Sequence, residues 1–162
     1  MRFSTSIILS GLLAIGFAAP VTNRRALAVQ AYNDFQVSDG VAGNALAEVQ
    51  AKFPIPADLA SVSAADQKVI SDARQVAESA ETDGFNPAIA AATGDAKTAL
   101  TNGKIKNKVL KLQLEVLDLQ ISQAKGKDET SQIAAEQKKL NTNIATDKKN
   151  AGQPSQSVPF SG

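Results

Sequence analysis

The sequence predicts an all-α protein, a chain of 162 residues with one domain, a small antiparallel bundle of about four to five helices. The run Lys104–Lys125 carries apolar residues spaced alternately by four and three, the period of a helix. Shorter stretches before and after it repeat this spacing. The chain has no cysteine, so a fold of this size depends on its hydrophobic core.

The central run has two apolar rows, which makes its apolar stripe wider than a coiled-coil seam. We therefore expect this helix to contact at least two neighbours. One row is Ile105, Val109, Leu112, Val116 and Leu119, and the other is Leu110, Leu114, Leu117 and Ile121.

The N-terminus has the pattern of a secretory signal peptide over residues 1–18. Its apolar segment, residues 7–17, is short for a membrane span, and an uncleaved anchor is the alternative interpretation. Cleavage between Ala18 and Ala19 places small residues, Gly16 and Ala18, at the two positions that need them.

A dibasic pair, Arg24–Arg25, follows in a proline-containing segment. In an exported chain such a pair is a candidate processing site, which makes residues 19–25 a candidate short pro-segment. Residues 26–151 are then the helical bundle domain, and residues 152–162 are predicted to be a disordered tail, because they are polar and rich in Pro, Gly and Ser.

Residues 26–53 are predicted to form a helix in two pieces. The expected break is Val37–Gly40, where Ser38 or Asp39 is able to cap the second piece. Pro54 ends this element, because a residue before proline leaves the helical region.

The next predicted helix begins at Ser63 with SAAD, a pattern that resembles a capping box, and ends near Asp83. Its outer surface is acidic. This surface either faces the lysine-rich start of the central helix or is simply solvated. The acids are Asp66, Asp72, Glu78, Glu81 and Asp83.

Residues 84–103 are predicted to be broken into short pieces. Asn86 and Pro87 have the pattern of a new helix start, with Asn as the cap and Pro at the first position. Thr93–Asp95 is the expected interruption, and Asn102–Gly103 the expected turn into the central helix.

After Gly126, a last helix is predicted from Asp128 to Lys149. The short loop makes it an antiparallel neighbour of the central helix. Folding the hairpin about Gly126 pairs Leu119 with Ile133, Leu112 with Leu140, and Val109 with Ile144.

Two stretches, YNDFQVSDGVAGNALAEVQAKFP at 32–54 and FNPAIAAA at 85–92, together with the central helix, carry a family resemblance. They resemble an uncharacterised family of small secreted proteins of filamentous (ascomycete) fungi. The resemblance covers most of the chain after the leader, and it implies export from a fungal cell. It carries no functional residues.

The composition excludes several kinds of chemistry. Without His or Cys, the chain cannot form a zinc site with those ligands, a Cys nucleophile or a Ser-His-Asp triad. No catalytic, cofactor-binding or metal-binding residue is predicted. Asp34 and Asp39 are the one candidate carboxylate pair, and caps or solvated acids explain both equally. The large aromatics Tyr32, Phe35, Phe53 and Phe85 are expected to fill the core, with lining an apolar cavity as the alternative.

These observations predict a secreted, non-enzymatic helical protein, extracellular or associated with the cell wall, with a binding or structural role. Its candidate partners are a cell-wall polymer, a host protein or another copy of itself. The balance of 17 basic and 16 acidic residues argues against nucleic-acid binding. Once the leader is removed, no stable membrane span is expected. The alternative function is an extracellular carrier of a small apolar ligand, such as a fatty acid, in the bundle core.

Overall fold

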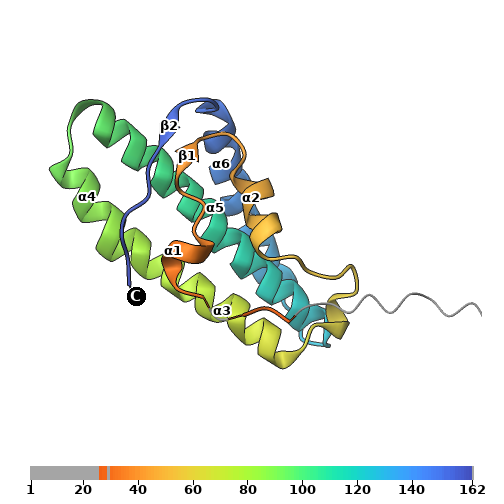
Figure 1. Cartoon of the computed structure of the whole chain (residues 1–162). Coiled ribbons are helices and arrows are strands. Elements are labelled where there is room, and N and C mark those ends of the chain that lie inside the picture. Colours follow the sequence, from red (N-terminus) through yellow and green to blue (C-terminus); the bar gives the residue numbers. More distant parts are fainter. Residues whose placement is uncertain (1–25, 29, 162) are drawn as a thin grey trace, which may run out of the picture.

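A computed structural model describes residues 26–28 and 30–161 and confirms the all-α bundle (Figure 1). The predicted signal peptide, its cleavage point at Ala18 and Ala19, and the dibasic pair Arg24 and Arg25 lie outside the described residues. The elements in chain order are α1 (Tyr32–Phe35), β1 (Gly40–Val41), α2 (Ala45–Lys52), the 3-10 turn η1 (Leu59–Ser61), α3 (Ala64–Ser79), the π-helical η2 (Ala80–Phe85), α4 (Asn86–Ala91), α5 (Gly94–Ala124), α6 (Thr130–Lys149) and β2 (Pro154–Ser155).

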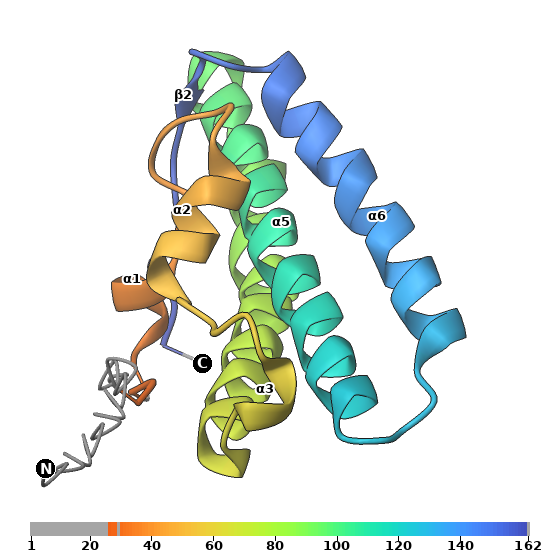
Figure 2. The same cartoon turned by 90° about the vertical axis from the view of Figure 1, so that its right-hand side faces the viewer.

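Helix α5 is the centre of the molecule, and Figure 2 shows it between α3 and α6. Most residues of its two apolar rows join two separate hydrophobic clusters, and the helix contacts more than one neighbour, as the sequence predicts. Ile105 and Leu119 of the first row belong to neither cluster. Leu110, Leu114, Leu117 and Ile121 join the main core with α1, α2 and α3. Val109, Leu112 and Val116 join a smaller cluster with Ala45 of α2 and Leu140 of α6.

The hairpin of α5 and α6 is antiparallel, with the pairing expected over most of its length (Figure 2). Leu112 and Leu140 are buried in the smaller cluster, which also contains Val109 and the partly buried Ile144. Near the hairpin loop the pairing is different. Ile133 lines an open groove with Leu59 of η1 and does not belong to the cluster. Helix α6 is therefore the most peripheral long helix of the bundle.

Helix α5 begins ten residues earlier than predicted and continues through Asn102 and Gly103 without a turn. A Cβ atom at position 103 would lie 2.8 Å from the carbonyl carbon of Gln156 and closer still to its oxygen. The side-chain amide of Asn102 donates to the Pro154 carbonyl at 2.8 Å. The prediction of a turn was wrong because these two residues serve a contact with a distant segment.

The predicted break at Gly84 is also absent, and α3, η2 and α4 form one continuous helical path. The Asn86 N–H bonds to the Glu81 carbonyl, five residues earlier, so Asn86 is helical and is not a cap. A π turn of this kind widens the helix just before Pro87, whose ring would otherwise clash with a preceding carbonyl. Gly84 leaves room for Val158, which would lie 2.8 Å from a Cβ atom there.

The first predicted helix is mostly not helical. Only one turn, α1, forms before the break, and the chain then enters β1. Gly40 and Gly43 have φ values of +82° and +117°, which suit glycine and prevent a helix there. Neither Ser38 nor Asp39 caps α2, because the carboxylate of Asp147 on α6 accepts the N–H of Ala45, the first residue of the helix, and that of Gly43 just before it.

The C-terminal segment, which composition predicts to be disordered, follows the surface of the bundle up to Phe160 (Figure 1). Its strand β2 pairs antiparallel with β1, and the Gln156 N–H donates to the Ala99 carbonyl at 3.0 Å. Val158 is buried in the main core, and the ring of Phe160 makes an edge contact with Tyr32. The segment is therefore ordered despite its polar composition, because its backbone hydrogen bonds and two apolar side chains bind it to the bundle.

Candidate functional site

The charged seam between α3–η2 and α5 is the largest group of ion pairs among the described residues. Glu81 lies 2.8 Å from Lys111, 3.7 Å from Lys104 and 3.9 Å from Lys108. Of the five acids predicted for this surface, Glu78 and Glu81 face the lysines at positions 104–111 of α5. The other three do not: Asp72 pairs with Lys68 on α3 itself, Asp83 is exposed, and Asp66 is buried. Further along the seam the base is on α3 and the acid is on α5, because Arg74 lies 2.8 Å from Glu115.

The seam is partly buried, and its charges shift each other's pKa. Burial alone would raise the pKa of Glu81, but the hydrogen bond and charge of Lys111, with Lys108 and Lys104, outweigh it and lower that pKa. Burial alone would lower the pKa of Lys111, but Glu81 and Glu78 outweigh it and raise that pKa. Both groups stay charged near neutrality, so the seam holds helices together and offers no proton donor or acceptor.

Lys106 is a completely buried cation, with a side chain that is 0% exposed. Its ammonium group lies 2.9 Å from a carboxylate oxygen of Glu48 and donates to the carbonyls of Asp39 and Val41, at 2.9 and 3.1 Å. All three donor positions of the ammonium group are used in this way. Lys106 therefore ties β1 and α2 to the central helix and is not free to act as a nucleophile.

Asp147 of α6 is the buried carboxylate that sequence reasoning missed. It is 2% exposed, and its two oxygens accept the N–H groups of Gly43 and Ala45, each at 2.9 Å. More than a hundred residues separate Asp147 from the N–H groups that it binds, so no local sequence pattern predicts this cap. The carboxylate has the structural role of an N-cap for α2, supplied by another helix.

Tyr32 and Asn107 form a buried polar link inside the main core. The Tyr32 hydroxyl donates to the side-chain oxygen of Asn107 at 2.8 Å, and the Asn107 amide donates to the Ala77 carbonyl at 2.8 Å. Burial, with a smaller contribution from the negative charge of Asp39, raises the pKa of Tyr32 to about 12. The phenol thus stays neutral and ties α1 through α5 to α3.

Asp34 and Asp39, the predicted carboxylate pair, do not form an acid–base site. Asp34 is exposed, whereas Asp39 accepts hydrogen bonds from both the N–H and the hydroxyl of Ser157, at 2.9 and 3.0 Å. Burial alone would raise the pKa of Asp39, but bonds from Ser157 and Gln36 and the charge of Lys106 outweigh it and lower that pKa. Asp39 is an anchor for the C-terminal segment.

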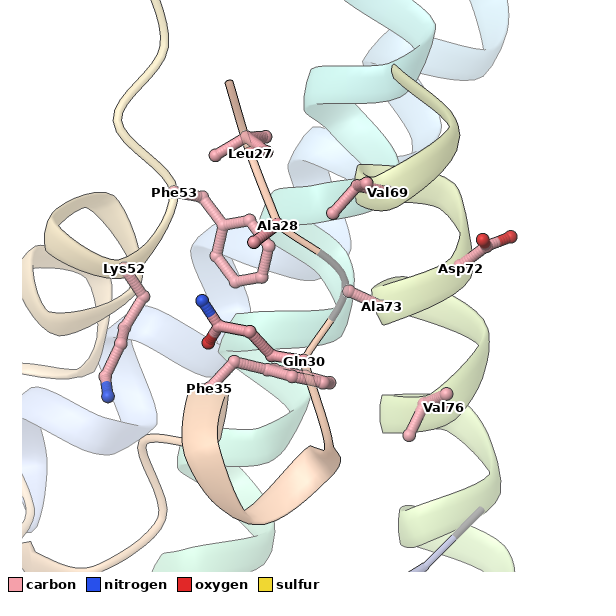
Figure 3. A pocket seen from close by; sticks show the side chains of 10 residues that line it. All are labelled: Leu27, Ala28, Gln30, Phe35, Lys52, Phe53, Val69, Asp72, Ala73 and Val76. Atoms are coloured by element: carbon pink, nitrogen blue, oxygen red, sulfur yellow. The ribbon is translucent and has the colours of Figure 1, made fainter. Parts of the chain in front are cut away.

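An apolar pocket lies where the N-terminal segment crosses between α3 and the end of α2 (Figure 3). The rings of Phe35 and Phe53 form one side, and Val69, Ala73 and Val76 of α3 form the other. Its volume is about 80 Å³, far below the ~300–1,000 Å³ of typical ligand sites. The full lining is Leu27, Ala28, Gln30, Phe35, Lys52, Phe53, Val69, Asp72, Ala73 and Val76.

The four large aromatics predicted to fill the core do so. Tyr32, Phe35, Phe53 and Phe85 are all buried in the main cluster, although Phe35 and Phe53 also line the small pocket. Edge contacts join Tyr32 to Phe35 and Phe35 to Phe53, with ring centroids 5.6 and 5.9 Å apart. The aromatic residues therefore pack against one another in the core, and Phe53 also lines a partly open groove of about 320 Å³ with Ile55 and Leu117.

Two further findings concern ions and membranes. Within residues 26–28 and 30–161, no group of three or more carboxylates is placed to hold a metal ion. In the same part of the chain, no helix combines the length and the apolar character that crossing a bilayer requires.

The fold and its polar contacts define a class of protein: an all-α bundle whose buried charged and polar groups tie chain segments to one another. The chain belongs to a family defined by a domain of unknown function (DUF8454), which matches residues 27–159. This match spans the described bundle and most of the C-terminal segment. Comparisons with curated proteins and with solved structures find no match.

Proposed function

We propose that this protein is a secreted, non-enzymatic helical protein with a binding or structural role in the extracellular space or at a fungal cell surface. The leader pattern of residues 1–18 supports export. The buried ionisable groups have structural roles, which supports a protein without catalytic activity. Lys106, Asp147 and Tyr32 each hold two or more segments together, and none of them lines the apolar pocket of Figure 3 or the groove of about 320 Å³ that shares Phe53 with it.

The outer face of α6 is the observation that supports a binding role. This helix packs against α5, with α2 at one end, and its other side is open (Figure 2). Lys138 and Lys149 lie three turns apart on that side, among small exposed residues such as Ala134, Thr142 and Ala145. Within the described residues neither lysine forms an ion pair, whereas the lysines of the α3–α5 seam do.

Three kinds of partner fit this open, basic face: a cell-wall polymer, a host protein or a second copy of the chain. The experiment is a charge reversal, Lys138→Glu with Lys149→Glu, in protein purified from culture medium. Its matched control reverses two exposed lysines elsewhere, Lys97 and Lys127, for the same change in net charge. Binding is measured by co-sedimentation with cell-wall polysaccharide and with host extracellular protein, and self-association by light scattering.

We expect the α6 reversal to remove most of one of these interactions and the control to retain it. Equal losses in both variants would show that the interaction responds to net charge and not to this face. Retention of full-length chain inside the cell, including residues 1–18, would contradict the export on which the proposal rests.

The alternative, a carrier of a small apolar ligand, has less support. A fatty acid needs a pocket several times larger than the 80 Å³ beside Phe35 and Phe53, and the larger groove of about 320 Å³ lined by Phe53, Ile55 and Leu117 is partly open and not enclosed in the core. A native mass spectrum of the secreted protein separates the two functions. A lipid-sized adduct that disappears on denaturation would favour the carrier, and a bare chain would favour the binding role.

A further inference from the structure

Asp66 at the start of α3 is a buried carboxylate with an unusual partner. The Ser63 hydroxyl accepts the Asp66 N–H at 3.0 Å, as in a capping box. The return bond from the carboxylate to Ser63 is not made. Instead, the Asp66 Oδ1 atom accepts the N–H of Leu27 at 2.8 Å, although 39 residues separate the two in sequence.

This carboxylate has no cation beside it in the described part of the chain. Asp66 is 7% exposed, and its one neighbouring base in sequence, Lys68, pairs with Asp72 at 2.8 Å. The N-terminal end of α3 offsets part of the charge, but a buried carboxylate is ordinarily paired. Among the described residues, the N–H of Leu27 is the one donor to this carboxylate, on Oδ1, which leaves Oδ2 for a further donor.

The segment held by Asp66 begins directly after the dibasic pair. Ala26 is exposed, whereas the side chain of Leu27 packs against the main core and lines the pocket in Figure 3. The family match also begins at residue 27. The chain is thus anchored to the bundle from Leu27 onwards, and the bond between Arg25 and Ala26 directly precedes that anchor.

We propose that a protease specific for paired basic residues trims the chain after Arg25, and that Asp66 binds the new α-ammonium group of Ala26. In this hydrolysis, water adds across the Arg25–Ala26 peptide bond, leaving a carboxylate on Arg25 and an ammonium group on Ala26. Consecutive residues are only about 3.8 Å apart, so an ammonium group on Ala26 lies within reach of the carboxylate that already binds Leu27. The trimming step rests on the export proposed above, because such a protease meets the chain along that route.

Binding of the new terminus to Asp66 makes trimming a stabilising event. Before cleavage, the nitrogen of Ala26 is a neutral amide and Asp66 is a buried charge with one neutral donor. After cleavage, the same position offers a cation with up to three donors to a partly buried carboxylate. The trimmed chain should therefore depend on Asp66 more strongly than the untrimmed chain does.

The experiment compares two purified chains, residues 19–162 and residues 26–162, each with Asp66 and with Asp66→Asn. Unfolding in urea is the measurement. We expect Asp66→Asn to raise the unfolding equilibrium constant about tenfold more in the trimmed chain than in the untrimmed one, as for a hydrogen-bonded charge pair. The control, Asp95→Asn, changes an exposed acid in the first turn of α5 and should have the same effect in both chains. Equal effects of Asp66→Asn in both chains would overturn the pairing.

Acetylation of the Ala26 amine provides a test that leaves Asp66 in place, should Asp66→Asn fail to fold. It removes the positive charge and keeps one N–H, and we expect it to raise the unfolding constant of the trimmed chain about tenfold. No change on acetylation would overturn the pairing.

The intact mass of the protein secreted by a eukaryotic host tests trimming separately. We expect a chain beginning at Ala26, and a chain beginning at Ala19 when Arg25→Ala removes the dibasic pair. A wild-type chain beginning at Ala19 would overturn the trimming step. If no chain reached the medium, the proposed export would fail instead, and the urea experiment would still decide the role of Asp66.

Discussion

Replacing Gly103 with alanine tests whether the C-terminal segment is part of the folded bundle. Gly103 lies inside α5, where alanine is normally favoured over glycine by about 1 kcal/mol. The new methyl group, however, would occupy the place of the Gln156 carbonyl and would lie 3.2 Å from the ring of Phe85. Overpacking costs about 1–3 kcal/mol, and a clash with backbone atoms belongs in the upper part of that range, about 2–3 kcal/mol, so after the gain in helix propensity the net loss of stability should be about 1–2 kcal/mol.

For a chain of this length, that loss lowers Tm by roughly 3–8 °C, measured by circular dichroism at 222 nm. The control Thr101→Ala changes an exposed residue one turn or less away on the same helix and should leave Tm nearly unchanged or raise it. In a chain that ends at Gln153, the sign for Gly103→Ala should reverse, because helix propensity then acts without the clash. An increase in Tm for Gly103→Ala in the full chain would refute the docking of residues 154–160 on α5.

Three further predictions concern the buried polar groups. Asp147→Ala leaves the N–H groups at the start of α2 without their acceptor and should cost about 2–4 kcal/mol in urea unfolding, with Asp147→Asn intermediate. Because the pKa of Glu81 is lowered in the folded protein, its stabilising effect is present above its unfolded pKa, near 4.5, and is lost as the pH falls through the folded pKa. In the Glu81→Gln variant, Tm should therefore decrease less than in the wild type as the solution is acidified. Tyr32 is the only tyrosine and the chain has no tryptophan, so absorbance at 295 nm reports it alone. With its pKa raised to about 12, the native protein should show little phenolate at pH 10.5, where the urea-unfolded chain is mostly ionised; equal ionisation of the two would contradict its burial.

The helical class and the central helix were predictable from sequence because they depend on spacing within a single segment. The two rows of α5 were each identified from steps of four and three, and most residues of each row join their own cluster. The same holds for the Ser63 cap and for the opening of α6 after Asp128. These features arise from contacts between residues close in sequence, which a local pattern records.

The predictions that failed depend on contacts between distant residues. Glycine is typical of turns, but at Gly84 and Gly103 it is required for another reason: a side chain there would clash with a residue of the C-terminal segment. Asp147 caps a helix that begins about a hundred positions earlier, and no local pattern indicates this. A glycine inside an apolar periodic run has two explanations, a turn or a close contact, and the sequence alone does not distinguish them.

The buried polar groups were missed for a related reason. Lys106 belongs to a cluster of lysines in the sequence, yet it alone is fully buried, since the carbonyls of β1 converge on its ammonium group. Whether a lysine lies on a solvated face or inside the fold depends on the position of β1, which is fixed by its pairing with β2. The candidate pocket depends on the same assembly, because Leu27, Ala28, Gln30 and Phe35 form part of its wall.

The last residues of the chain complete the first part of the core. Ser157 binds Asp39 across 118 positions, and Phe160 contacts Tyr32 from the outside of the bundle. Contacts of such long range form late, because closing a long loop costs entropy before any contact compensates for it. We therefore expect the Phe160 side of Tyr32 to be covered only once residues 154–160 have docked on the bundle.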